Sequence, residues 1–223
     1  QLNATAFYTV YDDYQAQSVE FTDQELRTTL NNVGELETKG VEVDAIALLG
    51  ENLTLTFGAA WIDATIEDYE GANCYTAQTE AQGCVEAIPG SGTYVQDLSG
   101  KDLNNSPDWK FNLGAKYDVP LSEMPFDGFI TAAYTWQDEL NFSLSNNPVT
   151  VHDSFGVANF SVGITERDSN LYSVNLFFNN AFDEDFASGI ADVSAIYNDA
   201  KTLMHHIPRA AERYAGVRVR LSF

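Results

Sequence analysis

Residues 214–223, the last of the chain, divide between a fully apolar face and a face that carries two arginines. In an extended strand, every second residue of this stretch lies on one apolar face: Ala215, Val217, Val219, Leu221 and Phe223. Arg218 and Arg220 lie on the other face. Two architectures accommodate such a strand, a soluble sandwich whose apolar faces pack on each other and a membrane barrel whose apolar face contacts lipid. This stretch alone leaves both open.

Similar extended patterns recur along the chain, separated by connections of alternating length. Strands are predicted at residues 2–19, 35–49, 53–61, 109–119, 130–136, 158–164 and 172–178. The short connections are 50–52, 120–128 and 167–170, and the long ones are 22–34, 63–106, 139–153 and 180–212. Alternate connections of an up-and-down sheet lie at the same end, so one rim carries tight turns and the other carries large loops.

This sorting of loop lengths is typical of an outer-membrane barrel, and a soluble sandwich gives no reason for it. The predicted strands are also long enough to cross a bilayer when tilted. The sequence therefore predicts an all-β, antiparallel, up-and-down transmembrane β-barrel, of which about eight strands lie in this chain. Rim positions on the lipid face are predicted for Phe57, Trp61, Trp109, Tyr117, Tyr134, Trp136 and Phe223.

The charge balance excludes some classes of partner. The net charge is −22, from 11 Lys plus Arg against 33 Asp plus Glu. Binding to nucleic acid requires clustered cationic side chains, so that class is excluded. Adsorption to an anionic membrane surface is disfavoured for the same reason. Because a charge on the lipid face is costly, we expect the acidic residues at the large-loop rim and in the lumen.

The two cysteines, Cys74 and Cys84, lie within the long connection 63–106. An even, local pair in a loop favours a disulfide in an oxidising compartment over two free thiols. A zinc site is disfavoured, because no third or fourth ligand follows at the required spacing.

Several segments resemble the C-terminal part of TonB-dependent outer-membrane receptors. They are LNATAFYTVYDDY at 2–14, NNVGELETKGVEVDA at 31–45, SPDWKFNLGAKYDV at 106–119, NAFDEDF at 180–186 and RYAGVRVRLSF at 213–223. The second segment matches the family's pattern through Asn32, Gly34, Lys39, Gly40, Val41 and Glu42. The fourth resembles the signature that precedes the last loop of that family.

The resemblance implies a barrel of about 22 strands, a plug domain and a segment that TonB grips, so that this chain is expected to be a C-terminal segment of the barrel. It implies a location in the bacterial outer membrane and uptake of a scarce nutrient, such as a ferric siderophore, cobalamin or a glycan. The expected partners are outer-membrane lipid, the TonB complex through the plug, and the barrel-assembly machinery. That machinery would recognise the terminal strand through Val219, Leu221 and Phe223.

The abrupt start at Gln1 also suggests a mature or truncated fragment with its targeting signal upstream. Two alternatives remain open. One is a free-standing small barrel with a structural or adhesive role, and the other is a soluble β-sandwich binding module.

No catalytic constellation is apparent, so the chain is not expected to be an enzyme, and no cofactor is expected. Candidate ligand-binding residues in loops or the lumen are Asp183, Glu184, Asp185, His205, His206, Arg218 and Arg220, with Lys110 and Lys116 also facing the lumen. For the loop residues, solvated side chains are the simpler interpretation, and no metal site is predicted. The acidic loops could hold Ca²⁺ through oxygen ligands, but they lack the spaced ligands of a specific site.

Overall fold

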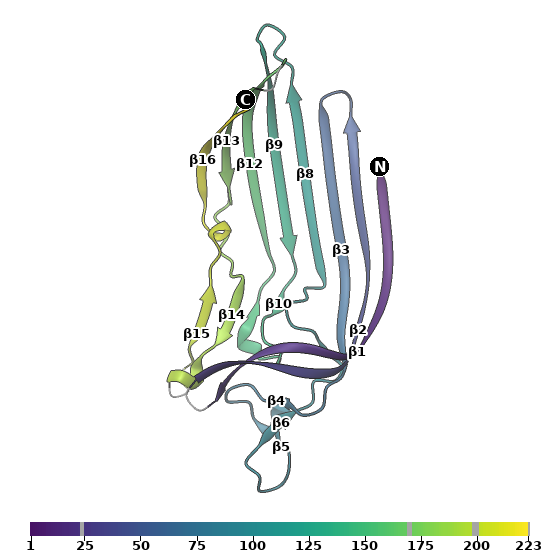
Figure 1. The fold of residues 1–223 in the computed structure, drawn as a ribbon, viewed down its shortest axis with the longest axis vertical. Coiled ribbons are helices and arrows are strands. Elements are labelled where there is room, and N and C mark those ends of the chain that lie inside the picture. Colours follow the sequence, from purple (N-terminus) through teal and green to yellow (C-terminus); the bar gives the residue numbers. More distant parts are fainter. Residues whose placement is uncertain (23–24, 169–170, 198–200, 223) are drawn as a thin grey trace.

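The computed structural model describes residues 1–22, 25–168, 171–197 and 201–222. Eight long strands form one antiparallel sheet in sequence order (Figure 1). They are β1 (Leu2–Thr22), β2 (Glu25–Leu49), β3 (Leu53–Asp68), β8 (Trp109–Val119), β9 (Phe126–Gln137), β12 (Phe155–Glu166), β13 (Tyr172–Asn179) and β16 (Tyr214–Leu221). This is the up-and-down order that the connections predicted, and the predicted 109–119 strand is β8.

The sheet is open at two edges. Within the described residues, β1 pairs with β2 alone and β16 with β13 alone, so the two edge strands do not pair with each other. The chain therefore folds as a wall of a barrel that it does not close.

The pairing register gives the sheet one apolar face. The row Ala45, Phe57, Leu113, Tyr134 and Ala158 runs across five neighbouring strands. Side chains on this face remain exposed to an extent unusual for a soluble core: Phe160 43%, Val162 49%, Val217 61% and Val219 60%. A second sheet would have covered them, and none lies there among the described residues. The arrangement is that of a barrel wall rather than of a sandwich, and this face is the outer one.

The predicted aromatic residues other than Phe223 share this outer face by register: Phe57, Trp61, Trp109, Tyr117, Tyr134 and Trp136. Trp61 pairs with Trp109 at one end of the β3–β8 ladder, and Tyr117 lies at the other end. Phe57 lies at the midpoint of this ladder, so it does not occupy a ladder end. Phe223 lies outside the described residues.

The prediction of a long loop at 22–34 is wrong. The β1–β2 ladder continues to the pair Thr22 and Glu25, and its outer part turns away from the strand direction and runs across the loop end (Figure 1). The bend includes Asp13, whose φ of 54° interrupts the ladder. The polarity of this segment suggested a loop, but its two strands pair through their backbones, and such pairing does not require an apolar pattern. The short connections after β2 and after β8 lie together at the opposite end (Figure 1).

The buried apolar core lies at the large-loop end and not between strands of the barrel wall. Its members are Val33, Leu36, Ile66, Ala72, Leu98 and Leu144, with Tyr14, Tyr69 and Leu103 packed against them. These residues come from the β1–β2 hairpin, the outer end of β3 and two connections. The connection after β3 contains β4 (Ala72–Asn73), η1 (Glu80–Gln82), β5 (Val85–Glu86), β6 (Tyr94–Gln96) and β7 (Lys101–Asp102). It is a small packed unit rather than an unstructured insertion.

In the described parts of the chain, no helix is long and apolar enough to cross a membrane.

On the inner face, aromatic rings lie over glycines of the neighbouring strand. Phe129 pairs with Gly163, and a Cβ atom at Gly163 would lie 2.5 Å from the Phe129 ring and 2.5 Å from the Val174 carbonyl oxygen. The same arrangement recurs for Phe177 over Gly216. These glycines are required by the close approach of a ring and, at Gly163, of backbone.

We expect Gly163→Ala to lower the free energy of unfolding of the receptor by about 1–3 kcal/mol, because the added methyl overpacks against a backbone oxygen that cannot move freely. Urea unfolding followed by the gel shift between folded and unfolded barrel measures this. Gly128→Ala is the matched control, since its Cβ would meet Val119 Cβ at 3.3 Å and no backbone atom closer than 3.6 Å. Equal losses for the two variants would contradict the packing argument.

Candidate functional site

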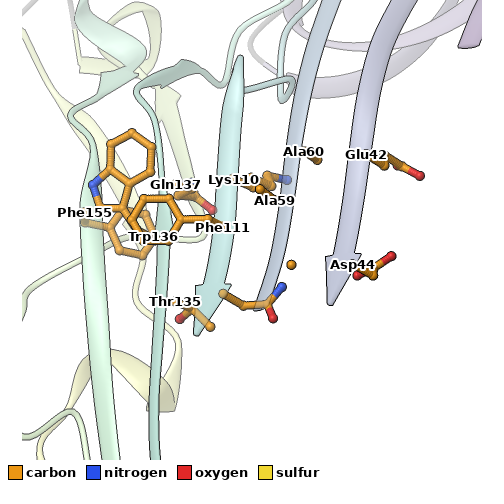
Figure 2. Close-up of a pocket in the computed structure, with 12 residues that line it drawn as sticks. Glu42, Asp44, Ala59, Ala60, Lys110, Phe111, Thr135, Trp136, Gln137 and Phe155 are labelled. Carbon is orange, nitrogen blue, oxygen red and sulfur yellow. The ribbon is translucent and has the colours of Figure 1, made fainter. Parts of the chain in front are cut away.

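The inner face of the sheet carries a polar groove of about 420 Å³. Glu42 and Asp44 on β2, Lys110 on β8 and Gln137 on β9 line it, together with Phe155 on β12 (Figure 2). Alternation along each strand brings these side chains to the face opposite the exposed apolar one. The groove therefore offers two carboxylates and one ammonium group to a polar ligand or protein surface in the lumen.

Further charges line the inner face closer to the short turns. Lys116 forms an ion pair with Asp118, with 2.7 Å between Nζ and Oδ1. The Arg218 guanidinium lies 5.6 Å from the centre of the Phe177 ring, a cation–π contact. Arg220 follows on the same face, opposite Ser173. Arg218 and Arg220 thus lie on the lumen side of the edge strand, as predicted from the alternation.

The acidic residues Asp183, Glu184 and Asp185 follow β13 at the large-loop end. Asp183 pairs with Arg213, with 3.3 Å between Oδ2 and Nη2. Glu184 contributes its backbone to Asn180: its N–H donates to Asn180 Oδ1 and its carbonyl accepts from Asn180 Nδ2, both at 2.9 Å. This segment is thus held in place by backbone and ion-pair contacts.

Asn180 is the fully buried centre of this connection. Besides its two bonds to Glu184, Asn180 Nδ2 donates to the Ala211 carbonyl oxygen at 2.9 Å, which joins the two ends of the connection between β13 and β16. Its φ of 48° lies in the left-handed region that asparagine tolerates. The sequence placed Asn180 within the NAFDEDF signature but did not reveal this structural role.

His205 and His206 lie on β15 (Leu203–His206), which pairs with β14 (Gly189–Asp192). Both are exposed. No group of three or more His, Cys, Asp or Glu side chains that could hold a metal ion occurs in the described part of the chain.

Buried amides join three of the large-loop connections. Gln96 Nε2 donates to the carbonyl oxygens of Asn73, at 2.7 Å, and of Ser145, at 2.9 Å. Asn147 Nδ2 donates to Asp192 Oδ2 at 2.9 Å. Gln96 is 6% exposed and Asn147 is 3% exposed. The sequence pattern did not indicate either residue, although Asn147 before Pro148 is a recognisable cap of the helical turn η2 (Pro148–Thr150).

Carboxylates gather where β8 begins. The pKa of Asp108 is raised above its usual value, mainly by partial burial. The negative charges of Asp102 and Asp138 raise it further, and those of Asp63 and Glu139 add a smaller effect. Like charges this close favour the protonated form of one member. Acidic residues therefore gather at the large-loop rim here.

The predicted disulfide between Cys74 and Cys84 is present, with 5.7 Å between the Cα atoms. It closes the part of the connection that contains η1. Beyond it, the Glu86 carboxylate accepts from the N–H groups of Gly90, at 2.9 Å, and Gly92, at 2.7 Å. These bonds hold the pKa of Glu86 below its usual value, so the carboxylate stays ionised and keeps the turn closed.

We expect reduction of this disulfide to loosen residues 75–83 and leave the barrel wall intact. The loop-entropy argument assigns the bond about 2–3 kcal/mol, confined to that connection. Hydrogen exchange should quicken at 75–83 after dithiothreitol treatment, while amides of β8 and β9 stay protected. Cys74→Ser with Cys84→Ser should reproduce the change, and a uniform increase in exchange across the strands would contradict it.

A family model described as TonB dependent receptor-like, beta-barrel, matches residues 1–181. The chain belongs to the TonB-dependent receptor family. No curated protein sequence matches it at a significant level. TonB-dependent receptors are outer-membrane proteins, and this barrel wall is therefore an outer-membrane structure.

Solved receptor structures share the fold of this receptor barrel. The ferric yersiniabactin uptake receptor FyuA of Yersinia pestis superposes with a TM-score of 0.68 and 14% identity, over 100% of this chain and 27% of FyuA. The siderophore receptor PiuA of Acinetobacter baumannii superposes with a TM-score of 0.59 and 17% identity, over 98% of this chain and 25% of PiuA. BauA, the ferric preacinetobactin receptor of the same species, superposes with a TM-score of 0.58 and 12% identity, over 98% of this chain and 26% of BauA. The chain thus spans about a quarter of the length of each.

Proposed function

We propose that this chain is the C-terminal segment of the barrel in a receptor that takes up a ferric siderophore in a TonB-dependent manner. The observation that carries the proposal is the open eight-stranded wall, which superposes over its whole length on a quarter of FyuA. The segment would supply the last strands of the barrel and several of its extracellular loops.

The two open edges support a larger barrel. In lipid, an unpaired strand edge leaves backbone N–H and C=O groups without partners, at several kcal/mol each. Strands from the rest of the receptor would pair with β1 and β16 and satisfy these groups. A free-standing barrel would need β1 to pair with β16, and within the described residues it does not.

The substrate class rests on the solved relatives, which are siderophore receptors by their names. The extracellular loops of this chain would form part of the outer vestibule, and the charged inner face, with Glu42, Asp44 and Lys110, would contact a plug domain or the passing ligand. Uptake would need TonB and no cofactor in this segment. The candidate loop residues Asp185, His205 and His206 are exposed and available to a ligand entering the vestibule.

Assembly would depend on the terminal strand. Val219 and Leu221 lie exposed on the outer face of β16, where an assembly factor could bind this edge strand. Phe223, the third residue of this signal, lies outside the described residues.

Growth assays test the transport proposal. A strain with the gene for the complete receptor deleted should lose growth on at least one ferric siderophore as the sole iron source, and the same loss should follow deletion of TonB. Unchanged growth on every siderophore, with loss of growth on cobalamin or a glycan, would overturn the substrate class. A stable, protease-resistant barrel formed by residues 1–223 alone in lipid would overturn the segment assignment and favour the free-standing barrel.

A further inference from the structure

The outer face carries an apolar groove of about 550 Å³, distinct from the polar groove of the lumen. Its lining includes Ala115, Ala132, Ala158, Tyr134, Phe160 and Phe182. The register explains its shape, because Ala132 of β9 pairs with Ala115 of β8 on one side and with Phe160 of β12 on the other. Small side chains thus form a floor, and larger ones from the same strands form the walls.

Phe182 lines the groove and comes from a different part of the chain. It lies in the connection after β13, and its position is fixed by the neighbouring Ala181, whose N–H donates to the Ala158 carbonyl oxygen at 2.8 Å. Its side chain is 72% exposed, although it is a large apolar ring next to a buried anchor, Asn180. Most of the surface of this ring is therefore not covered by the protein.

The location of the groove indicates what kind of molecule would bind in it. The groove opens on the lipid-facing surface of an outer-membrane barrel, so it is continuous with an interface that hydrocarbon already covers. Phe182 lies at the large-loop end, which faces the outer leaflet in this type of barrel.

We propose that this groove binds one acyl chain of an outer-leaflet lipid, with Phe182 packed against the chain at its extracellular end. The proposal does not depend on what the receptor transports. A chain held there is ordered and exchanges slowly, in contrast to the lipids around it.

Spin-label spectroscopy tests the proposal on the complete receptor. The receptor is reconstituted in phosphatidylcholine vesicles that contain a trace of the same lipid with a nitroxide near the end of one acyl chain, and the motionally restricted chains per receptor are counted. Ala132→Leu fills the floor with an apolar side chain and leaves the lipid face apolar. We expect about one restricted chain fewer than in the unmodified receptor. Ala4→Leu, on the outer face of β1 and outside the groove, is the matched control and should change nothing.

Phe182→Ala gives a second test that does not touch the barrel wall. Removal of this exposed ring should leave the barrel folded and speed the exchange of the restricted chain, whereas Leu176→Ala, on the outer face away from the groove, should not. Equal counts and exchange rates for all variants would overturn the proposal. A receptor dimer that Ala132→Leu dissociates would also overturn it, because a second copy would then occupy the groove.

Discussion

Asn180→Ala should release the connection between β13 and β16 from the end of the barrel wall. The change removes three side-chain hydrogen bonds of 2.9 Å, to Glu184 N, Glu184 O and Ala211 O. Each buried group left without a partner costs about 1–3 kcal/mol, so we expect local opening to become easier by about 3–5 kcal/mol. Hydrogen exchange of residues 181–186 and 209–213 in the complete receptor measures this loss.

Asn146→Ala is the matched control for this change. Asn146 has nearly the same backbone conformation, with φ of 53° against 48° for Asn180, but its side chain makes an exposed contact of 3.3 Å with the Asp102 carbonyl oxygen. Both variants place alanine at a positive φ and share that energetic cost. The difference between their exchange rates therefore measures the contribution of the buried Asn180 hydrogen bonds. Similar exchange in the two variants would mean that backbone conformation, and not Asn180's hydrogen bonds, holds the connection.

Val219→Arg should impair insertion of the barrel into the outer membrane. Val219 is 60% exposed on the outer face and pairs with Val174, so the new charge would enter the lipid-facing band. Such a charge costs about 2–4 kcal/mol near the middle of the bilayer and less toward the interfaces. The yield of folded receptor in outer-membrane fractions, read from its gel mobility without heating, measures the effect.

Arg218→Ser is the control on the adjacent residue. The side chain of Arg218 lies on the inner face over Phe177, so serine replaces one polar group in a wet lumen with another. We expect near-normal amounts of folded receptor. Equal defects for Val219→Arg and Arg218→Ser would contradict the assignment of the two faces of β16.

The alternation of side chains predicted the barrel wall because one face of each strand must be apolar where it meets lipid. The strand at 109–119 was predicted to the residue, since Trp109 begins and Val119 ends an unbroken alternation. The hairpin at 22–34 was missed for the opposite reason. Its two strands pair through backbone hydrogen bonds, which the mostly polar side chains of the segment do not reveal.

The site was less predictable than the wall. The lumen positions of Arg218 and Arg220 followed from alternation, and the disulfide followed from an isolated pair of cysteines. The roles of Asn180, Asn147 and Gln96 depend on partners up to 49 residues away along the chain, and no local pattern encodes such partners. Burial of an amide is a tertiary property, which a single sequence does not display.

The buried amides at the large-loop end limit how the surface of this receptor can be re-engineered or can diversify. Gln96 and Asn147 tie each large connection to the next, and Leu98 and Leu144 share one core with the β1–β2 hairpin. A single connection grafted from another receptor would leave its neighbours with unpaired amides and an empty place in that core. Chimeras that exchange these connections as one block should keep their shape, and antibodies raised against this surface should recognise epitopes assembled from several connections.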